Sequence, residues 1–363
     1  MPNQFPWDSY SDQPYILKRE TKKELRKSHG LDYLKLIATN IFYFPYLFLK
    51  FYFKSIGSIS SNDKSKANNT FDKIEPTVSK GFYGLCVNLD KGEEQYELVE
   101  ELGVTSLQIR IFLNDIKDID AYVAFARGFG ENKELLITII QDREHIENHE
   151  LLIKDITTIF QKFKGVANEF QIGNAINRIK WSFVSMEEYL AFYATVQKVR
   201  DEQFPEIKLI GSSVIDFEYH FTIRTLFNGY KIHYDKFNSL LYVDRRGSPY
   251  ATQMGMFNFK NKIEFLHTIV KSSNKSEKSI YLTEANWPLT GTAPYAPTSE
   301  KECVSEELYT QYMIEYFEIA LTSQKIEKVY WHQLIAGGYG LVDNRDGTIR
   351  KTKAFYSLKK LLK

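Results

Sequence analysis

Eight β-rich runs alternate with helical periods across residues 81–363, and this alternation limits the possible folds more than any other feature of the chain. We expect strands near Phe82–Asn88, Ser106–Leu113, Leu135–Ile140, Glu169–Asn174, Lys208–Ser213, Asn238–Val243, Ser279–Glu284 and Lys328–Leu334. The helical periods between them include Glu93–Leu102, Ile119–Phe129, Glu150–Phe163, Met186–Arg200, Asn261–Ser272, Ser305–Thr322 and Thr352–Leu362. Strands that alternate with helices form a parallel sheet, and eight such units can close into a ring. The sequence therefore predicts an α/β protein with a (β/α)₈ barrel over residues 81–363.

A long apolar stretch precedes the barrel. From Leu36 to Phe53 the chain is nearly apolar and is interrupted only by Asn40, Pro45 and Lys50. A helix that crosses a bilayer needs about 20 apolar residues, and Pro45 lies in the middle of a shorter run. We therefore expect a helix–break–helix that inserts shallowly, with residues 1–56 as a membrane-associating segment and residues 31–56 at the membrane surface. The alternative is a helix pair packed on the barrel.

The flanking residues guide the expected location. Residues 1–30 are polar and then basic, and no apolar core with a small-residue cleavage site follows them as in a secretory signal. We expect a peripheral or monotopic protein on the cytoplasmic face of the inner membrane. A membrane-anchored periplasmic protein is the alternative, because positive charge lies mostly on the amino-terminal side of the apolar stretch. Residues 57–80 are rich in Ser, Asn and Lys and are predicted to be a linker.

Charge and metal-ligand content exclude several classes of function. The chain has 47 basic and 46 acidic residues, and its formal net charge of +1 argues against nucleic-acid binding. Its two cysteines, Cys86 and Cys303, and its seven histidines show no spacing typical of a metal site. We expect no metal and no cofactor. The sequence does not indicate a protein partner.

Chemistry in a (β/α)₈ barrel takes place at the carboxyl ends of the strands. Glu284 follows the run Ile280-Tyr281-Leu282 and is expected at the mouth of the seventh strand. A carboxylate there can attack an anomeric carbon, although it can equally cap the loop or pair with an arginine. The other strand-end candidates are Asn88, Arg110, Asp142, Asn174, Ala175, Asp216, Tyr242, Asp244 and Trp331.

Three strand ends carry a family resemblance. The Gly173-Asn174-x-x-Asn177 turn, the Thr283-Glu284-x-x-Trp287 turn and the run at Trp331 together resemble clan A glycoside hydrolases. The runs 330–334 and 339–343 are similar to those of bacterial members, and the run 241–247 resembles glycosidase-like proteins of bacterial cell-surface polysaccharide clusters, such as those for lipopolysaccharide or capsule. The resemblance implies a (β/α)₈ fold and cleavage of glycosides with retention.

The same resemblance implies a role for each residue. Glu284 would be the nucleophile, and Asn174 would bond the sugar hydroxyl next to the anomeric carbon. Arg110 would orient Glu284 and keep it ionised, Tyr242 would donate a hydrogen bond to it, and Trp331 would form the floor of the sugar subsite. Arg110 could instead pair with an acidic neighbour, and Tyr242 and Trp331 could be core. The remaining candidates for substrate binding are Trp287 and Asn88.

Ala175 departs from the family pattern, because it occupies the position of the acid/base glutamate. A methyl group cannot transfer a proton, and the loss of general acid–base help costs about 10²–10⁴-fold in rate. Either the change is engineered, or the protein naturally binds glycan without cutting it, or another acid substitutes. Candidates for such an acid are Asp142, Glu144, His145, Asp216 and Glu218.

The sequence thus predicts a glycosidase-like protein that acts on or binds an oligo- or polysaccharide of a bacterial surface, with hydrolysis strongly impaired by Ala175. The alternative is a non-catalytic glycan-binding or scaffold protein of a membrane polysaccharide assembly complex.

Overall fold

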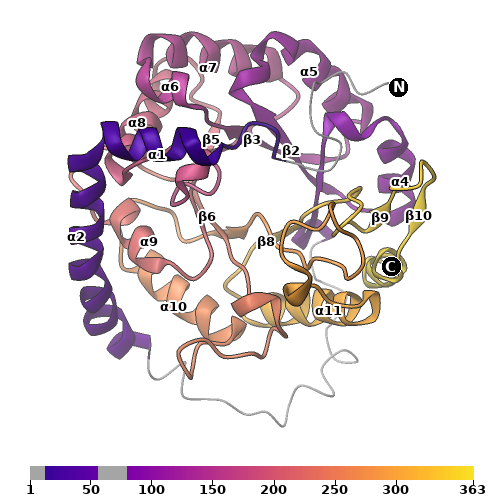
Figure 1. Ribbon diagram of the computed structural model, residues 1–363. Coiled ribbons are helices and arrows are strands. Elements are labelled where there is room, and N and C mark those ends of the chain that lie inside the picture. The colour runs from indigo at the N-terminus through magenta and orange to yellow at the C-terminus, as the bar shows by residue number, and fades with distance from the viewer. Residues whose placement is uncertain (1–12, 56–79) are drawn as a thin grey trace.

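A closed barrel of eight parallel strands forms the centre of the protein in a computed structural model, which describes residues 13–55 and 80–363 (Figure 1). Each strand pairs with the next, and β8 pairs with β1. The predicted (β/α)₈ barrel is confirmed, and all eight strands lie where the sequence placed them to within a few residues. Their bounds are β1 Tyr83–Val87, β2 Ser106–Phe112, β3 Glu134–Ile140, β4 Glu169–Ile172, β5 Lys208–Ile215, β6 Lys236–Leu240, β7 Ile280–Leu282 and β8 Lys328–Trp331.

The strands are short and almost wholly buried, because helices cover their outer faces and side chains fill the interior. All seven residues of β2 are buried. Polar side chains inside the barrel bond one another, as Gln108 Nε2 does to Thr138 Oγ1 at 2.8 Å. Gly84 makes room for the Tyr330 ring of β8, since a Cβ at position 84 would lie 2.5 Å from Tyr330 Cδ1.

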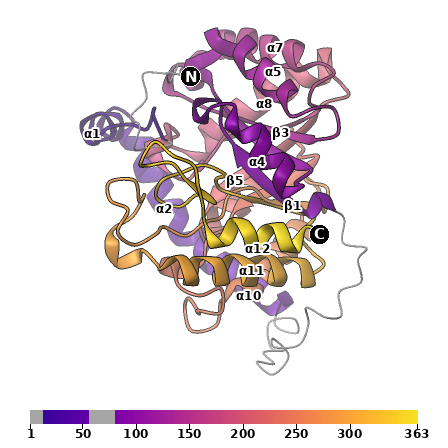
Figure 2. The ribbon, with the colours of Figure 1, turned by 90° about the vertical axis from the view of Figure 1, so that its right-hand side faces the viewer.

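Helices surround the barrel, and the seven predicted ones are present: α4 Glu94–Leu102, α5 Ile119–Gly128, α7 His149–Phe163, α8 Met186–Gln203, α10 Phe259–Lys271, α11 Glu306–Thr322 and α12 Lys353–Leu361. Figure 2 shows α12 beside α11. The sequence missed α6 (Arg143–Glu147) and α9 (Tyr219–Leu226). A two-stranded antiparallel ribbon, β9 (Val342–Asp343) with β10 (Arg350–Lys351), precedes α12.

Two further helices lie before the barrel, α1 (Arg19–Ser28) and α2 (Gly30–Leu47). The expected break at Pro45 is wrong, because α2 passes through Pro45 and continues as a π-helical turn, Phe48–Tyr52. The Phe48 N–H reaches the carbonyl oxygens of both Phe44 and Pro45, so the wider turn accommodates the proline. The predicted linker, residues 57–80, lies almost entirely outside the described residues.

One face of α2 packs against the barrel beside α9, as Figure 1 shows. Leu47 and Phe51 are buried there, and Leu36, Tyr43 and Phe48 pack on the same core. This contact stabilises the helix through Pro45, because tertiary packing outweighs the loss of one backbone hydrogen bond. The alternative of a helix pair packed on the barrel is thus met in part: one continuous helix, not a pair, packs there with one face.

Candidate functional site

Glu284 and Tyr242 meet at the barrel mouth. Each follows the end of its strand by two residues, and the pairing of Ser239 with Leu282 holds β6 and β7 level. Tyr242 Oη donates a hydrogen bond of 2.7 Å to Glu284 Oε1. Within the described residues this is the only hydrogen bond of the half-buried Glu284 carboxylate, so its second oxygen is unoccupied by protein. The bond that the resemblance implies is therefore present.

Arg246 completes this pair, although sequence reasoning gave it no role. Its guanidinium carbon lies 3.6 Å from the centre of the Tyr242 ring. Arg246 Nη1 also donates to the backbone oxygen of Asn286 at 3.0 Å and to its Oδ1 at 3.2 Å. Burial and the nearby Glu284 carboxylate raise the pKa of Tyr242 well above its usual value, against the opposing effect of Arg246. Tyr242 therefore stays protonated as a hydrogen-bond donor.

Arg110 and Asn88 lie together on neighbouring strand ends. Arg110 Nε donates to Asn88 Oδ1 at 3.2 Å, and Asn88 Nδ2 donates to Gln333 Oε1 at 2.6 Å. All three side chains are buried. Asn88 therefore positions Arg110 across β1, β2 and the loop after β8. Gln333 was not a candidate from the sequence, although it lies inside the run 330–334 at the end of the eighth strand.

The Asn174 turn is fixed by Gln141 from the end of β3. The Asn174 backbone N–H donates to Gln141 Oε1 at 2.9 Å. Gln141 Nε2 donates to the backbone oxygen of Asn174 at 3.0 Å and to that of Trp181 at 2.6 Å. Gly173 supplies the left-handed conformation of the turn, with φ 86°. The Asn174 carboxamide makes no hydrogen bond within residues 13–55 and 80–363. Its donor and acceptor groups thus have no protein partner there.

Ala175 is buried in an apolar cluster. It is 1% exposed and lies with Phe112, Ile140, Trp181 and Leu240, side chains that come from the ends of β2, β3 and β6 and from the loop after β4. Tyr15, Ile16 and Ile215 pack against the same cluster. The position expected for the proton donor is therefore filled and surrounded by hydrocarbon.

Tyr15 and Ile16 belong to residues 13–17, which we call the cover segment. Tyr15 Oη donates to Asp115, and its ring meets that of Phe112 edge-on at 5.5 Å. The Leu17 N–H donates to the Lys180 oxygen at 2.9 Å, and Lys180 Nζ donates to Gln13 Oε1 at 2.9 Å. Burial raises the pKa of Asp115 to about 6, and the bond from Tyr15 opposes this rise. Sequence reasoning missed the cover segment, because its short apolar run is followed by charged residues that suggest a surface tail.

The carboxylates proposed as substitute acids after β3 and β5 are mostly engaged. Asp142 bonds His145 Nδ1 at 2.8 Å, and Asp155 bonds the other ring nitrogen at 3.0 Å. Burial lowers the pKa of His145, but these two carboxylates outweigh it and the pKa is raised. Arg178 pairs with both remaining loop acids, Asp216 at 2.6 Å and Glu218 at 2.7 Å. Glu144 is exposed.

Trp331 and Trp287 are core residues, and the expected floor of a sugar subsite is wrong for Trp331. The two side chains are 0% and 1% exposed, and their rings stack at 5.8 Å. Trp331 Nε1 donates to Tyr309 Oη at 2.8 Å, and Trp287 Nε1 donates to the Gly247 oxygen at 3.0 Å. Neither ring presents a face to a ligand, because both side chains are fully buried and pack against aromatic residues of α11.

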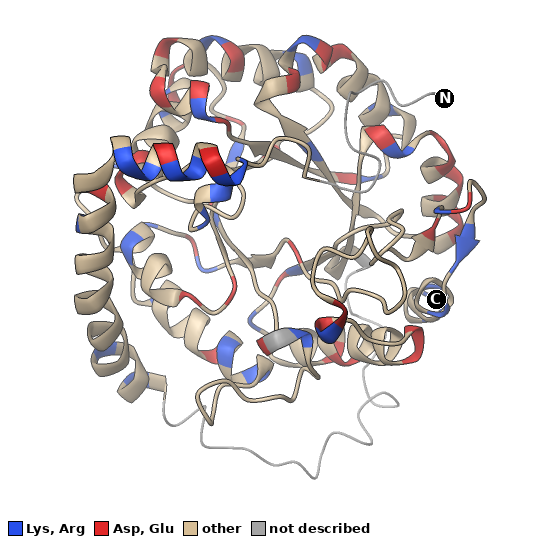
Figure 3. Ribbon diagram, in the orientation of Figure 1, with Lys and Arg blue, Asp and Glu red and all other residues tan. Residues whose placement is uncertain are grey.

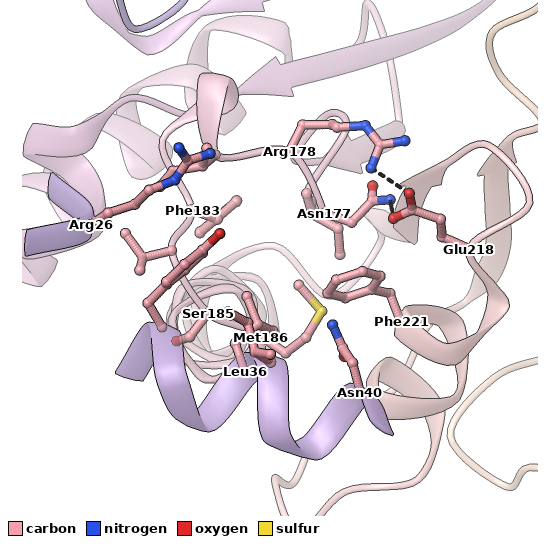
Figure 4. A pocket seen from close by; sticks show the side chains of 15 residues that line it. Arg26, Leu36, Asn40, Asn177, Arg178, Phe183, Ser185, Met186, Glu218 and Phe221 are labelled. Atoms are coloured by element: carbon pink, nitrogen blue, oxygen red, sulfur yellow. Dashed lines mark hydrogen bonds and ion pairs between the residues drawn. The ribbon is translucent and has the colours of Figure 1, made fainter. Parts of the chain in front are cut away.

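A separate cavity of about 320 Å³ lies between the N-terminal helices and the loops after β4 and β5. Figure 4 shows Arg178 and Asn177 turned toward Glu218, with Arg26 and Leu36 on the helical side. Glu218 accepts from Arg178 at 2.7 Å and from Asn177 at 2.8 Å, so these polar groups satisfy one another. None of Glu284, Tyr242, Asn174 and Arg110 lines this cavity. Across the described residues, no group of three or more His, Cys, Asp or Glu side chains is placed to hold a metal ion.

Solved structures similar to this chain include glycoside hydrolases. A β-glucosidase from Thermotoga maritima in complex with glucoimidazole matches with a TM-score of 0.60 and 12% identity, over 78% of this chain and 98% of the other. The virulence factor SghA from Agrobacterium tumefaciens matches with 0.59 and 10%, over 78% and 97%. The GH39 enzyme from Xanthomonas axonopodis pv. citri matches with 0.52 and 12%, over 78% and 66%. No protein-family model and no curated protein matches the chain. These similarities establish a glycosidase-like fold.

Proposed function

We propose that the barrel mouth binds a saccharide of a bacterial surface polysaccharide and that Glu284 is a retained glycosidase nucleophile. The Tyr242–Glu284 pair carries this proposal, because it holds one carboxylate oxygen at 2.7 Å and leaves the other without a partner among residues 13–55 and 80–363. The unbonded Asn174 carboxamide and the positioned Arg110 support it, since both lie at strand ends of the same mouth. The polysaccharide assignment rests on the resemblance of the run that carries Tyr242 and Arg246.

The proposed chemistry is the first half of a retaining reaction. A Glu284 oxygen forms a bond to the anomeric carbon while the bond from that carbon to the leaving oxygen breaks, and the leaving group departs with the electron pair. An ordinary alkoxide leaving group needs a proton at this moment, and the methyl group of Ala175 cannot supply one. We therefore expect ordinary glycosides to react about 10²–10⁴-fold more slowly than with a complete acid/base pair.

Activated substrates test the nucleophile, because dinitrophenolate leaves without a proton. We expect a dinitrophenyl glycoside of the correct sugar to give a burst of one dinitrophenolate per protein and a stable one-sugar adduct on Glu284, seen by intact-mass and peptide spectrometry. Glu284→Gln should abolish both, since its neutral amide is a poor nucleophile. Glu144→Gln, which changes an exposed carboxylate of α6, should keep both. A sugar that binds by calorimetry but gives no burst and no adduct would overturn the proposal.

The second candidate function is a non-catalytic glycan-binding or scaffold protein of a membrane polysaccharide assembly complex. The burial of Ala175 under the cover segment favours it, because the leaving-group side of the mouth is occupied by protein. In that case, oligosaccharide binding should be equal for the wild type and Glu284→Gln, and no adduct should form. Weakened binding in Glu284→Gln together with an adduct in the wild type would exclude it.

A further inference from the structure

Helix α2 has a second apolar face that no described part of the protein covers. Together with its continuation to Ser55, the helix places large side chains at helical spacing along the side opposite α9. They are Leu31, Leu34, Ile41, Phe42, Leu49 and Phe53, with exposed fractions of 85%, 63%, 66%, 75%, 67% and 66%. We call these six residues the outer face. Exposed apolar side chains that gather in one stripe mark a surface that another phase or molecule covers.

We propose that the outer face binds the surface of a lipid bilayer, with α2 lying in the plane of the interface. This goes beyond the saccharide site and does not depend on it. A stripe on one helix suits a bilayer, because lipid accepts apolar side chains without requiring a matching shape, and an interfacial helix buries only one face. Lys35 and Lys54 flank the stripe and are exposed, so their ammonium groups can reach the headgroups.

The geometry argues against a crossing helix. Residues Gly30–Ser55 form 26 residues of helix, about 39 Å, which is long enough to span a bilayer. Its inner face, however, buries Leu47 and Phe51 and packs Leu36, Tyr43 and Phe48 on the barrel core. To cross, the helix would have to leave the barrel and expose that core. The helix can therefore contact lipid with one face only.

Helix α1 supplies the matching charge. It carries five cations, Arg19, Lys22, Lys23, Arg26 and Lys27, against two carboxylates. None of the five forms an ion pair within the described residues, and all but Lys22 are exposed. Figure 3 shows blue bands with some red along α1, directly before α2, which is almost free of charge. An unpaired basic helix joined to an apolar stripe is complementary to a surface with anionic headgroups.

Vesicle co-sedimentation of the full chain tests the proposal. We expect the wild type to bind phosphatidylcholine vesicles that contain phosphatidylglycerol, and to bind pure phosphatidylcholine vesicles more weakly. The triple variant Ile41→Ser, Phe42→Ser, Leu49→Ser should lower the partition coefficient at least about tenfold, because three apolar side chains no longer enter the lipid. Lys23→Glu with Lys27→Glu should remove the preference for the anionic vesicles.

A matched control changes three exposed apolar residues elsewhere on the barrel: Ile153→Ser, Leu308→Ser and Tyr356→Ser. This triple should bind vesicles as the wild type does. Equal losses in the two triples, or a wild type that binds neither kind of vesicle, would overturn the proposal. If the wild type ignored vesicles but sedimented as a dimer that the outer-face triple converts to a monomer, the face would belong to a second copy instead.

Site labelling tests the in-plane orientation. In a Cys303→Ser background, Lys27→Cys and Lys54→Cys place single reactive thiols near the two ends of the helix. A membrane-impermeant maleimide added outside preloaded vesicles should label both positions at similar rates. Protection of one end alone would show a crossing helix and overturn the in-plane arrangement.

Discussion

Ala175→Glu tests the apolar cluster at the position of the missing acid, because it places a carboxyl group among hydrocarbon side chains. Ala175 is 1% exposed, so any longer side chain must displace its neighbours, which costs about 1–3 kcal/mol of unfolding free energy. Ala175→Gln carries that cost without a charge. The comparison of the two variants therefore isolates the burial of the carboxylate.

Asp115 gives the expected size of the pKa rise for a carboxyl group at position 175, because Tyr15 of the same cover segment bonds Asp115. Burial raises the pKa of Asp115 from an ordinary 3.8 to about 6, a rise of about two units. An equal rise for the introduced carboxyl would cost about 2.7 kcal/mol at pH 8, where it must ionise. At pH 4 the group is mostly protonated in both the folded and the unfolded state, and the two variants should be equally stable.

Urea unfolding at pH 4 and pH 8 measures this difference. We expect Ala175→Glu to match Ala175→Gln at pH 4 and to be about 2.7 kcal/mol less stable at pH 8. Equal stability at both pH values would refute the reasoning, because the introduced carboxylate would then be solvated. The side chain at position 175 would then reach water instead of the apolar cluster.

Three further predictions follow from individual contacts. Tyr242→Phe should slow the dinitrophenolate burst about 10–100-fold with the fold intact by circular dichroism, because a hydrogen bond to the Glu284 carboxylate is worth about 1.5–3 kcal/mol. Because the pKa of Asp115 is raised, the wild type loses stability as the pH rises from about 4 to about 6. Asp115→Asn should remove this loss and raise the unfolding free energy by up to about 3 kcal/mol at pH 7, measured by urea unfolding. Trp331→Phe should lower the unfolding free energy by about 1–3 kcal/mol through the lost bond to Tyr309 and leave saccharide affinity unchanged, measured by urea unfolding and calorimetry.

The barrel could be predicted from sequence because each strand is a short apolar run bounded by turns, and each long helix has a polar side. Helix α9 lacks that signal, since Tyr219 and every residue of Phe221–Leu226 are buried and its apolar and polar residues nearly alternate, which is a pattern typical of a strand. The continuation through Pro45 was also beyond sequence reasoning. Local rules break a helix at proline, whereas packing against α9 holds it together.

Only those residues of the candidate site that lie at strand ends could be predicted from the sequence. Glu284, Tyr242 and Asn174 each lie two residues after the end of a strand, so the positions of the predicted strands locate them. Asn88 and Gln333 are 245 positions apart, and their hydrogen bond has no local trace in the sequence. Trp331 was misassigned because an aromatic residue at the end of a strand has the same pattern whether it faces the mouth or the helices.

The cover segment, α1 and α2 are one continuous stretch, and this connects the missing acid with the outer face. Tyr15 and Ile16 pack against the apolar cluster that contains Ala175, so a larger side chain at position 175 would disturb the packing beneath the cover segment. A lone truncation of a polar catalytic residue would leave an empty or wet space, but the methyl group is in full apolar contact. This favours a chain built around alanine at this position. The cover segment also leads directly into the helices that we place on the bilayer. Residues 13–55 would therefore contact both ligands that we propose. The outer face would bind the lipid surface, and the cover segment would lie beside a saccharide at the mouth.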